Sequence, residues 1–449
     1  MIKEETVYDV FVIGGGVNGC AIARDAAGRG LTVCLAEMND LGSGTSSAST
    51  KLIHGGLRYL KYFDFRLVRE SLKEREVLLK NMPHICWPMR FVLPVPNSII
   101  QKILIRLGLF VYDNLGGRTI LPGTKSIRIK DSDMGSLLKN KFSSAFVFSD
   151  CWVEDARLVI LTAVDAQRRG AHILTHTKVT KIKREEKYWR VTTENKRGTI
   201  KEIFSSSIVN AAGPWVNTVE KYASQEGASI NLVKGSHIVV KKMFKDEVSY
   251  FLLGKDGRII FVIPFQRSFT LIGTTEKPHD SMSHDPYCSK EEKQYLIEFA
   301  NNYFHSNLGL KNVLWSYSGV RPLYQKMSSK RGSVSSITRD YMLNMESTNG
   351  LPILTIYGGK LTTHRKLAEN ALFKLKSCFP NMGEPWTSKE PLPGGDFELN
   401  KKPFLIKELC EKYPFLDDNW STRLINNYGT LCTDFLRNAR TIEDLGIDF

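Results

Sequence analysis

Apolar and polar positions in the first fifty residues predict a β-α-β unit followed by a loop. Val7 to Ile13 is a β-branched and aromatic run that ends in a glycine cluster, as a buried strand does. Val17 to Arg29 is alanine-rich and predicts a helix closed by Gly30, and Leu31 to Glu37 predicts a second strand. A loop rich in glycine, serine and threonine follows from Leu41 to Thr50.

The rest of the chain changes from mixed α/β to β-rich and then to helical. Helices are predicted at about Phe65–Asn81, Ile99–Tyr112, Arg157–Arg169 and Leu361–Ser377, and a polar helical pattern runs from Pro391 to the end. The strands predicted are a hairpin from His172–Ile182 and Tyr188–Thr193, a buried strand at Ser207–Asn210, and an antiparallel sheet from short alternating runs between Ser236 and Ile272. This order predicts an α/β protein with a β-rich middle and a helical C-terminal region.

Composition is that of an ordinary globular protein apart from the charge. With 449 residues, 42% of them hydrophobic and 24% charged, the chain is neither disordered nor a collagen-like repeat nor a small disulfide scaffold. The 62 lysines and arginines exceed the 47 acidic residues and leave a formal charge of +15. Such a surplus indicates an anionic partner, which is a nucleic acid, a phosphorylated substrate or the acidic face of a membrane.

Neither the N-terminus nor the cysteines indicate export or membrane insertion. The chain has no apolar run of about eighteen residues, and its start is acidic where a signal peptide needs an apolar core. The eight cysteines are scattered without a C-x-x-C pair, which predicts buried, reduced thiols in a cytosolic protein.

A dinucleotide-binding fingerprint occupies the first turn of the β-α-β unit. It is the G-x-G-x-x-G run formed by Gly14, Gly15, Gly16, Val17, Asn18 and Gly19. The glycines permit the tight turn, the approach of a pyrophosphate and close helix–strand packing, and the helix N-terminus attracts phosphate. Glu37, at the end of the next strand, can accept hydrogen bonds from ribose hydroxyls and would repel a 2′-phosphate, so NADP is disfavoured. A glycine-rich turn in an unrelated α/β unit is the alternative.

The segment after the second strand favours FAD over NAD. Residues Leu41 to Tyr59 are small, hydroxylated and basic, which suits a long cofactor that needs close backbone approach and many hydrogen-bond donors. An NAD domain would normally continue directly with alternating strands and helices. A flexible linker is the alternative, but His54, Arg58 and Tyr59 within the segment argue against a passive spacer.

The segment TSSASTKLIHGGLRYL at 45–60, with the fingerprint before it, resembles that of the FAD-dependent, aerobic respiratory glycerol-3-phosphate dehydrogenases. Further matching segments follow in order: FRLVRESLKEREVLL at 65–79, SDCWVEDARLV at 149–159, VNAAGPWV at 209–216, KGSHIVV at 234–240, FVIPF at 261–265, IGTTE at 272–276, YSGVRPL at 317–323, ITRDY at 337–341 and YGGKLTTHRKLAE at 357–369. The resemblance covers essentially the whole chain. It implies oxidation of sn-glycerol 3-phosphate to dihydroxyacetone phosphate, with electrons passing to FAD and then to a membrane quinone.

The resemblance also implies a Rossmann-like FAD-binding domain assembled from separate segments, an antiparallel-sheet substrate domain and a C-terminal helical cap. FAD-binding segments are expected at 1–80, 149–230 and 336–384, an insertion (in the substrate domain or at the membrane surface) at 81–148, the substrate-binding sheet at 231–335, and the cap at 385–449. A homodimer, cytoplasmic and peripheral on the inner face of the cytoplasmic membrane, is expected. Family members continue past Leu392–Gly395 into a longer cap, so the cap here is either naturally short or truncated.

Arginines are the residues expected to bind the substrate phosphate, because a guanidinium forms a planar fork with permanent charge. Arg321, in the turn-like SGVRP, and Arg58 are the candidates that the resemblance also suggests, and Tyr59 can donate its hydroxyl to the same group. Pro322 is expected to stiffen the loop that carries Arg321. A surface ion pair is the alternative for any one of these arginines.

Oxidation at C2 requires a base for the hydroxyl proton while a hydride leaves towards the flavin. His237 in KGSHIVV is the candidate base, because histidine titrates near working pH, and His54 and His364 are alternatives in cofactor-lining motifs. Arg339 in ITRDY is expected to orient the C2 oxygen. A hydrogen-bonded structural histidine is the alternative for His237.

The segment Gly358–Thr363 brings two glycines, a cation and a helix N-terminus together. Its backbone N–H groups and Lys360 would stabilise negative charge near N1 of a reduced flavin. A threonine-capped helix start with an incidental lysine is the alternative. The residues expected to contact FAD are Gly14, Gly15, Gly16, Asn18, Gly19, Glu37, Thr45, Ser46, Ser47, Ser49, Lys51, Ile53, Val179, Ala211, Gly213, Gly359, Lys360, Leu361 and Thr362.

The apolar stretch Ile99–Tyr112 has two interpretations. It is either an amphipathic element that lies in the interface of an anionic membrane or a buried core helix, and it is too short to span a bilayer. The basic residues that flank it and favour the first interpretation are Arg90, Arg118, Lys125, Arg128 and Lys130.

Other functions are less favoured by the sequence. A glycerol-3-phosphate oxidase would pass electrons to oxygen, but the insertion that oxidases of this family carry is not found in the middle of this chain. A non-catalytic flavoprotein that binds RNA is disfavoured because the residues of a complete phosphate and hydride site occur together. A metal site is not expected, since His172 and His176 stand four apart in a predicted extended run, about 13 Å from each other.

Overall fold

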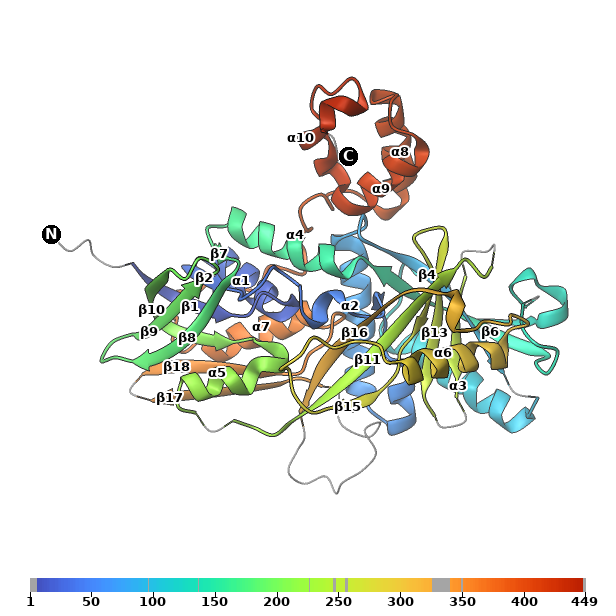
Figure 1. Ribbon diagram of the computed structural model, residues 1–449, viewed down its shortest axis with the longest axis horizontal. Helices are drawn as coiled ribbons and strands as arrows, with labels where there is room; N and C mark the ends of the chain where they lie inside the picture. Colours follow the sequence, from blue (N-terminus) through green and yellow to red (C-terminus); the bar gives the residue numbers. More distant parts are fainter. Residues whose placement is uncertain are drawn as a thin grey trace.

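Two large β-sheets and a group of C-terminal helices make up the structure (Figure 1). The computed structural model describes residues 6–95, 97–135, 137–225, 227–244, 248–254, 257–324, 340–348 and 350–446. The sheet that holds the N-terminal strands lies at one end of the long axis, the second sheet lies towards the other end, and the C-terminal helices sit above the two. The α/β fold with an antiparallel sheet and C-terminal helices, predicted from the sequence, is confirmed.

The first sheet is built on parallel strands whose carboxyl ends meet at one edge. Its path is β17-β18-β10-β1-β2-β7, with β9 paired to β10 and β8 to β9. Its strands are β1 (Val7–Ile13), β2 (Val33–Ala36), β7 (His172–Leu174), β8 (Thr177–Arg184), β9 (Trp189–Asn195), β10 (Ile200–Asn210), β17 (Met342–Thr348) and β18 (Leu351–Tyr357). Because Ile13 pairs in parallel with Ala36 and Asn210, the turns that follow β1, β2 and β10 lie together.

The central strand β1 is apolar almost throughout because other elements pack on both faces of the sheet. Val10 and Val12 belong to a core with α1, α4 and α7, whereas Phe11 and Ile13 belong to a core with β8, β9 and α5. The helices concerned are α1 (Val17–Gly28), α4 (Asp155–Arg168), α5 (Val216–Tyr222) and α7 (His364–Leu375). A strand buried on both faces has no polar side, so it appears in the sequence as a continuous apolar run.

The second sheet is mainly antiparallel, with the path β15-β11-β14-β13-β12-β4-β6-β3, and with β16 paired to β11 and β5 to β6. Its strands are β3 (Leu52–Ile53), β4 (Cys86–Val95), β5 (Lys125–Arg128), β6 (Ser144–Val153), β11 (Ile230–Lys241), β12 (Ser249–Leu253), β13 (Ile259–Phe265), β14 (Phe269–Gly273), β15 (Lys277–His279) and β16 (Val313–Tyr324). Helix α6 (Lys290–Tyr303) packs on one face, and α2 (Phe65–Asn81) and α3 (Ile99–Leu115) pack on the other.

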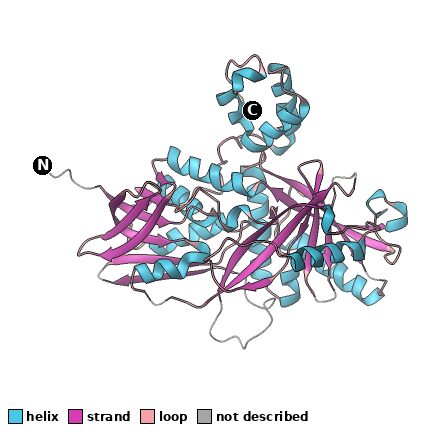
Figure 2. Ribbon diagram, viewed as in Figure 1, coloured by secondary structure: helices cyan, strands magenta, loops and turns pink. Residues whose placement is uncertain are grey.

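The C-terminal helices form a group with a core of its own, visible as an all-helical unit in Figure 2. They are α8 (Lys402–Lys412), α9 (Asp418–Tyr428) and α10 (Cys432–Leu436). Contacts with the rest of the protein include Lys402 Nζ, which donates to the carbonyl of His84 at 2.9 Å, and Arg157, whose guanidinium lies 4.0 Å from the ring centre of Tyr428. Gly394 at the entry has φ +84°, and a Cβ there would lie 2.1 Å from a carbonyl oxygen, so the close backbone contact requires glycine.

The structure corrects two local predictions about strands. Arg321 and Pro322 lie within β16 and pair with β11, and they are not in a turn. In the described sheet β16 pairs with β11 alone, and an edge strand of this kind tolerates proline. The run His172–Ile182 is two strands, because the chain turns at His176, where φ is +49°. Before this turn β7 pairs with β2, and after it β8 pairs with β9.

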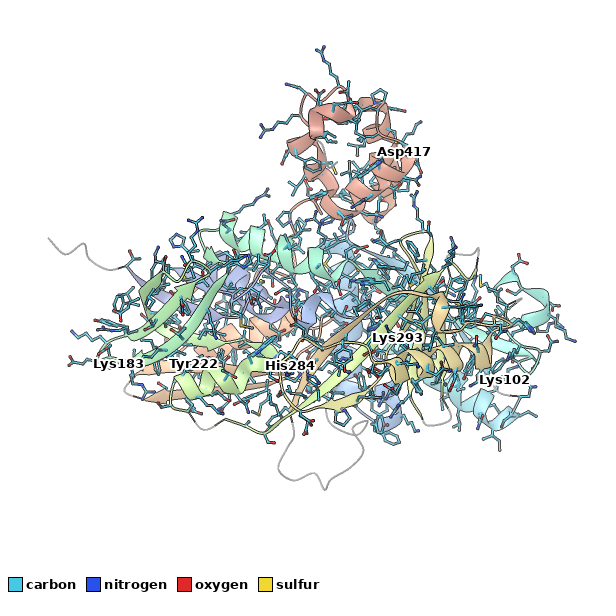
Figure 3. All side chains as sticks on the ribbon, in the orientation of Figure 1. Lys102, Lys183, Tyr222, His284, Lys293 and Asp417 are labelled. Carbon is cyan, nitrogen blue, oxygen red and sulfur yellow. The ribbon has the colours of Figure 1, made fainter. Side chains whose placement is uncertain are left out.

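Helix α3 does not form the buried core helix that one interpretation of its sequence predicts. Leu109 and Tyr112 are its buried residues. Its exposed large apolar residues, 58–77% exposed, are Ile99, Ile100, Ile103, Leu104, Leu107 and Phe110. Lys102 of this helix and Lys183 of β8 lie at opposite ends of the molecule in Figure 3. Within the described ranges, no helix has the length and apolar character needed to cross a membrane.

Candidate active site

The turn between β1 and α1 permits close approach of a phosphate to the backbone. Gly14 has φ +110°, and a Cβ there would lie 2.6 Å from the carbonyl oxygen of Ala211. A Cβ on Gly19 would lie 1.9 Å from the carbonyl oxygen of Gly14, so α1 packs directly on the turn. Gly16 precedes α1, whose first N–H groups have no partner within the helix. The turn therefore offers N–H donors without side chains that would fill the space.

Glu37 lies beside this turn at the end of β2. Its carboxylate accepts hydrogen bonds from the N–H of Gly15 at 2.7 Å and of Asn39 at 2.8 Å. These bonds fix the carboxylate and leave lone pairs on each oxygen for further donors. Strand β8, which carries Val179, begins next to Glu37, because the N–H of Thr177 donates a hydrogen bond to the carbonyl of Glu37 at 2.8 Å. The arrangement suits recognition of ribose hydroxyls.

The loop that follows β2 connects the two sheets through threonine and serine side chains. Ser46 Oγ accepts a hydrogen bond from the N–H of Val17 at 3.0 Å, at the start of α1. Thr45 Oγ1 donates to the carbonyl of Val320 at 2.6 Å, within β16 of the second sheet. The loop is therefore fixed between the fingerprint helix and the strand that carries Arg321.

A buried carboxylate that the sequence analysis did not single out anchors the next part of the loop. Asp155, at the start of α4, is 1% exposed and accepts hydrogen bonds from Ser49 Oγ at 2.7 Å and Lys51 Nζ at 2.5 Å. Burial raises the pKa of Asp155 even though the charge of Lys51 and these hydrogen bonds act in the opposite direction. The signal available in the sequence is its place in SDCWVEDARLV, immediately before a predicted helix.

The turn before α7 closes the site from the other side. Asn18 Nδ2 donates to the carbonyl of Gly358 at 3.0 Å and connects this turn to α1. Gly359 has φ +105°, and a Cβ there would lie 2.6 Å from the side chain of Asn18. Lys360 Nζ lies 4.2 Å from the ring centre of Tyr59 and is buried without a hydrogen-bond partner among the described residues. A buried ammonium of this kind requires an acceptor, which a bound group would supply.

Arg321 and Arg58 bring two guanidinium groups into one buried region. Arg58 Nη1 lies 3.3 Å from Glu276 Oε1, and these side chains are 11% and 8% exposed. Burial lowers the pKa of Arg321 and the charge of Arg58 lowers it further, whereas Tyr59 raises it. In the part of the chain that the structure describes, no carboxylate pairs with Arg321. An anion bound beside both arginines would relieve this repulsion.

The ring of His237 in β11 is 1% exposed and is held on several sides. Its Nε2 lies 2.9 Å from Thr50 Oγ1. The ring stacks on Tyr317 of β16, with centroids 4.7 Å apart and planes inclined by 13°. A Cβ on Gly273 would lie 2.1 Å from the ring, so the absence of a side chain there makes room for the imidazole. Thr50 and Tyr317 were not predicted as site residues, although both lie in segments that resemble the family.

The electrostatic surroundings keep this imidazole neutral. Burial lowers the pKa of His237 well below its ordinary value of 6.5, and the charges of Arg321 and Lys51 lower it further. The ring is therefore neutral near pH 7, in the form that accepts a proton. Of the two alternative histidines, His54 already uses Nδ1 to accept a hydrogen bond from the N–H of Gly56 at 3.1 Å.

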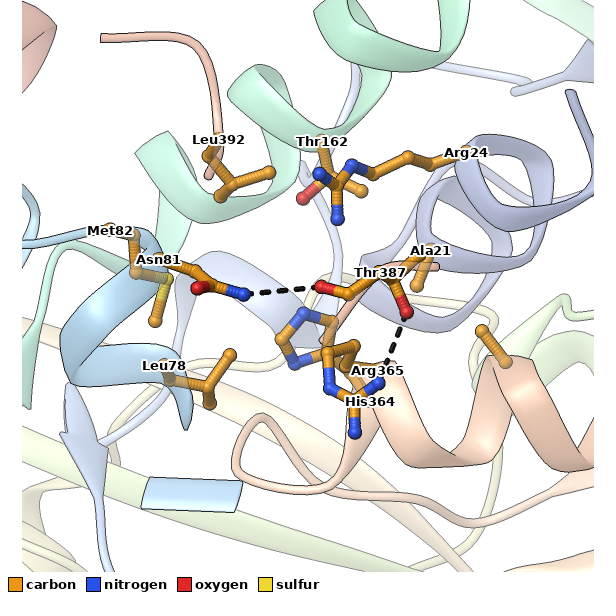
Figure 4. Close-up of a pocket in the computed structure, with 11 residues that line it drawn as sticks. Ala21, Arg24, Leu78, Asn81, Met82, Thr162, His364, Arg365, Thr387 and Leu392 are labelled. Carbon is orange, nitrogen blue, oxygen red and sulfur yellow. Dashed lines mark hydrogen bonds between the residues drawn. The ribbon is translucent and has the colours of Figure 1, made fainter. Parts of the chain in front are cut away.

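His364, the second alternative, lines a small cavity among α1, α2, α4 and α7 (Figure 4). The cavity has a volume of about 20 Å³. Nδ1 of His364 lies 2.6 Å from the carbonyl oxygen of Leu361, and burial lowers the pKa of the ring to about 4. Thr387 lines the same cavity, with its hydroxyl 3.1 Å from Arg365 Nη1. These surroundings are typical of a structural histidine.

The other predicted residues lie at the ends of strands or in the turns next to them. Ile53 ends β3, and the N–H of Ala211, just after β10, donates to the carbonyl of Ile13 at 2.9 Å. Ser47 and Gly213 lie in the short 3₁₀ helices Thr45–Ser47 and Gly213–Trp215, and Leu361 and Thr362 lie in the turn before α7. Arg339 lies outside the described residues. The structure thus brings Arg58, Tyr59, His237, Arg321 and Lys360 into one region.

These features fit FAD. Three of the buried polar atoms that lack a hydrogen-bond partner among the described residues lie at the two turns that face each other: Asn18 Oδ1, Lys360 Nζ and Thr363 Oγ1. The glycine cradle suits the pyrophosphate, Glu37 suits the ribose, and the cation beside the Gly358–Gly359 turn suits the flavin. Among the described residues, no group of three or more His, Cys, Asp and Glu side chains has the arrangement of a metal site.

Comparisons with known proteins agree with this fit. Residues 9–365 match the family described as FAD dependent oxidoreductase. The D-erythritol 1-phosphate dehydrogenase of Brucella abortus is 45% identical over 451 residues, which cover 100% of this chain and 89% of that protein. The aerobic glycerol-3-phosphate dehydrogenase of Escherichia coli is 44% identical over 449 residues, which cover 98% of this chain and 87% of that protein.

A solved structure supports the same assignment. The glycerol-3-phosphate dehydrogenase from Bacillus halodurans, complexed with FAD, superposes with a TM-score of 0.77 at 27% identity, over 96% of this chain and 77% of that chain. The predicted resemblance, the FAD-binding fold and FAD as the cofactor are therefore confirmed. The chain belongs to the FAD dependent oxidoreductases, in the family of the FAD-dependent glycerol-3-phosphate dehydrogenases.

Proposed function

We propose that this protein oxidises sn-glycerol 3-phosphate to dihydroxyacetone phosphate. The observation that carries the proposal is the pair of neighbouring guanidinium groups of Arg321 and Arg58, next to a neutral imidazole and to Lys360, whose ammonium has no hydrogen-bond partner among the described residues. A phosphomonoester dianion needs charged donors in fixed directions, and a secondary alcohol needs a base close by. The name of the relative from Escherichia coli supports glycerol 3-phosphate as the alcohol.

In this proposal the phosphate binds to the two arginines. Arg321 has no carboxylate partner in the described structure, so its full charge is available to the phosphate. Arg58 is held by Glu276 at 3.3 Å, which fixes the direction of its guanidinium, and its positive charge attracts the phosphate. Tyr59 donates its hydroxyl to the same group.

The C2 hydroxyl is proposed to lose its proton to His237. FAD, when bound, supplies the flavin that accepts the hydride from C2. Lys360, over the ring of Tyr59 at 4.2 Å, is proposed to stabilise negative charge near the reacting groups. Arg339, which lies outside the described residues, is proposed to orient the C2 oxygen. The predicted FAD contacts and the domain boundaries given above remain part of the proposal.

We propose a membrane quinone as the final electron acceptor and the apolar face of α3 as the membrane contact. The six exposed apolar residues of α3, with Lys102 on the same helix, match an amphipathic helix that lies in the interface of an anionic bilayer. Peripheral attachment to the inner face of the cytoplasmic membrane and a homodimer belong to the same proposal. An oxidase that uses oxygen is the second candidate, which the relation to dehydrogenases disfavours.

Vesicle binding tests the membrane part. Leu104→Glu with Leu107→Glu is expected to abolish co-sedimentation with vesicles that contain anionic lipid, because both side chains are about three-fifths exposed at 62% and 58%. Lys183→Glu at the opposite end of the molecule is the control and should retain binding. Equal binding by all three proteins would refute the role of α3.

Reoxidation tests the electron acceptor. After anaerobic reduction by glycerol 3-phosphate, a dehydrogenase regains its oxidised flavin spectrum rapidly with a quinone analogue and slowly with oxygen. Fast recovery in oxygen would favour the oxidase. Failure of glycerol 3-phosphate to reduce the flavin, with reduction by D-erythritol 1-phosphate, would reassign the substrate.

A further inference from the structure

We propose that Thr50 and Tyr317 are positioning residues that orient His237 so that its Nδ1, and not its Nε2, receives the substrate proton. The inference rests on the proposed function, because it assigns the atom that acts in that reaction. It concerns two side chains that none of the site predictions included.

The two ring nitrogens of His237 have different surroundings. Nε2 lies 2.9 Å from Thr50 Oγ1, whereas Nδ1 is buried and has no hydrogen-bond partner among the described residues. A neutral imidazole carries one N–H, and the hydrogen bond of one nitrogen sets the tautomer of the ring. With the proton on Nε2, the N–H donates to Thr50 and Nδ1 keeps a free lone pair. With the proton on Nδ1, a buried N–H would lack an acceptor, which is costly.

Tyr317 prevents the ring from turning to exchange these nitrogens. Its ring stacks on the imidazole at 4.7 Å and 13°, and its hydroxyl donates to the carbonyl of Ser49 at 2.8 Å. Gly273 lies on β14, where any side chain would meet the imidazole. Ser49 and Thr50 are neighbours in the chain, so one loop fixes both the stacking partner and the hydrogen-bond partner of the imidazole.

The charged and titratable groups around His237 come from the loop and from β16. They are Lys51, paired with Asp155 at 2.5 Å, and Arg321 and Tyr317 of β16. In the proposed step the O–H bond at C2 breaks and an N–H bond forms at Nδ1. The electron pair of the C2–H bond leaves as the hydride that FAD accepts, and the C2–O bond becomes a carbonyl.

The hydrogen bond between His237 and Thr50 therefore stabilises the imidazole most strongly when the ring is protonated and charged. Nε2–H then donates a charge-assisted hydrogen bond to Thr50 Oγ1, which is stronger than the bond made by the neutral ring. An interaction that strengthens towards the transition state raises kcat and leaves substrate binding unchanged. Loss of a hydrogen bond to a charged group corresponds to a decrease in kcat of about 10- to 100-fold.

The test compares Thr50→Val, which removes the hydroxyl at nearly constant shape, with Thr50→Ser, which retains it. Thr50→Val is expected to lower kcat for glycerol 3-phosphate by about 10- to 100-fold with KM and flavin content unchanged. It should also move the acid limb of the pH profile to lower pH, because the charged imidazole loses a stabilising acceptor. Thr50→Ser should stay within about threefold of the parent protein.

The results distinguish a failure of the proposed function from a failure of the positioning role of Thr50 and Tyr317. If the parent protein is not reduced by glycerol 3-phosphate, the proposed function fails. If the parent is active and Thr50→Val keeps its kcat and pH profile, or Thr50→Ser is as impaired as Thr50→Val, the positioning role is overturned. If Thr50→Val loses flavin, Tyr317→Phe decides, since it keeps the stacked ring and removes the hydroxyl. A lower kcat at constant flavin content would then support the role, and an unchanged kcat would refute it.

Discussion

The ion pair between Lys51 and Asp155 is expected to stabilise the position of the loop that follows β2, and a substitution in this pair tests that role. Asp155→Asn keeps the shape of the side chain and removes its charge. The pair has an N–O distance of 2.5 Å, and its side chains are 12% and 1% exposed. Removing one partner of a buried pair leaves an unpaired charge and costs about 3–5 kcal/mol. Burial raises the pKa of Asp155, which means that desolvation already disfavours its charged form. Replacing the carboxylate by an amide removes this desolvation cost, so we expect a loss of stability at the lower end of the range, about 3 kcal/mol.

A matched exposed pair gives the control. Arg128 and Asp131 are 2.8 Å apart with side chains 85% and 58% exposed, so Asp131→Asn should change stability by less than about 1 kcal/mol. The free energy of unfolding is measured by urea titration of the flavin-free protein, and flavin retention by its absorbance after gel filtration. Asp155→Asn is expected to lose both stability and flavin. Adding Lys51→Met to Asp155→Asn should recover part of the stability, because no unpaired charge remains. If Asp155→Asn and Asp131→Asn destabilise equally, the anchoring role of this pair is wrong.

Three further outcomes are expected. Burial lowers the pKa of Lys402 to about 7, so above that pH the unfolded chain holds a proton that the folded chain lacks. Stability should therefore rise with pH from 7 towards the unfolded value of about 10.5, and Lys402→Met should flatten this rise in thermal unfolding scans at pH 7 and 9.5. Gly14→Ala should abolish flavin binding, whereas Gly30→Ala, also at positive φ but with no atom within 4 Å of the new Cβ, should retain it, as measured by the flavin-to-protein ratio. Arg321→Lys should raise KM for glycerol 3-phosphate by about tenfold in steady-state assays, because a lysine cannot form the planar fork.

Local patterns predicted those parts of the site whose geometry is set by neighbouring residues. The tight turn at Gly14 and the packing of Gly19 on it arise within a few residues, so glycine spacing alone was sufficient to predict them. The apolar run of β1 was equally informative, because burial on both faces removes polar residues from the strand.

Contacts between distant segments could not be predicted in the same way. Ser49 and Asp155 are 106 positions apart, and Thr50 and His237 are 187 positions apart. Nothing in the local composition of either member indicates the other, since the pairing depends on how the two sheets are joined. For the same reason Arg321 was expected in a turn: its glycine and proline neighbours indicate a turn locally, whereas pairing with β11 makes the segment a strand.

Whether the apolar residues of α3 are buried or exposed could also not be predicted from the sequence alone. An apolar helix of this length is compatible with a core or with an interface, and its surroundings decide which. In the structure α3 packs through Leu109 and Tyr112, and the rest of its apolar residues are left exposed.

The most direct test of the central claim is the flavin spectrum of the purified protein under anaerobic conditions. Glycerol 3-phosphate is added, and the absorbance of the oxidised flavin is followed, with glycerol as the control that lacks the phosphate. Rapid bleaching by glycerol 3-phosphate and none by glycerol is the result that the arrangement of Arg58, Arg321 and His237 predicts. A bound flavin that remains oxidised with glycerol 3-phosphate, or that is bleached equally by glycerol, would contradict it.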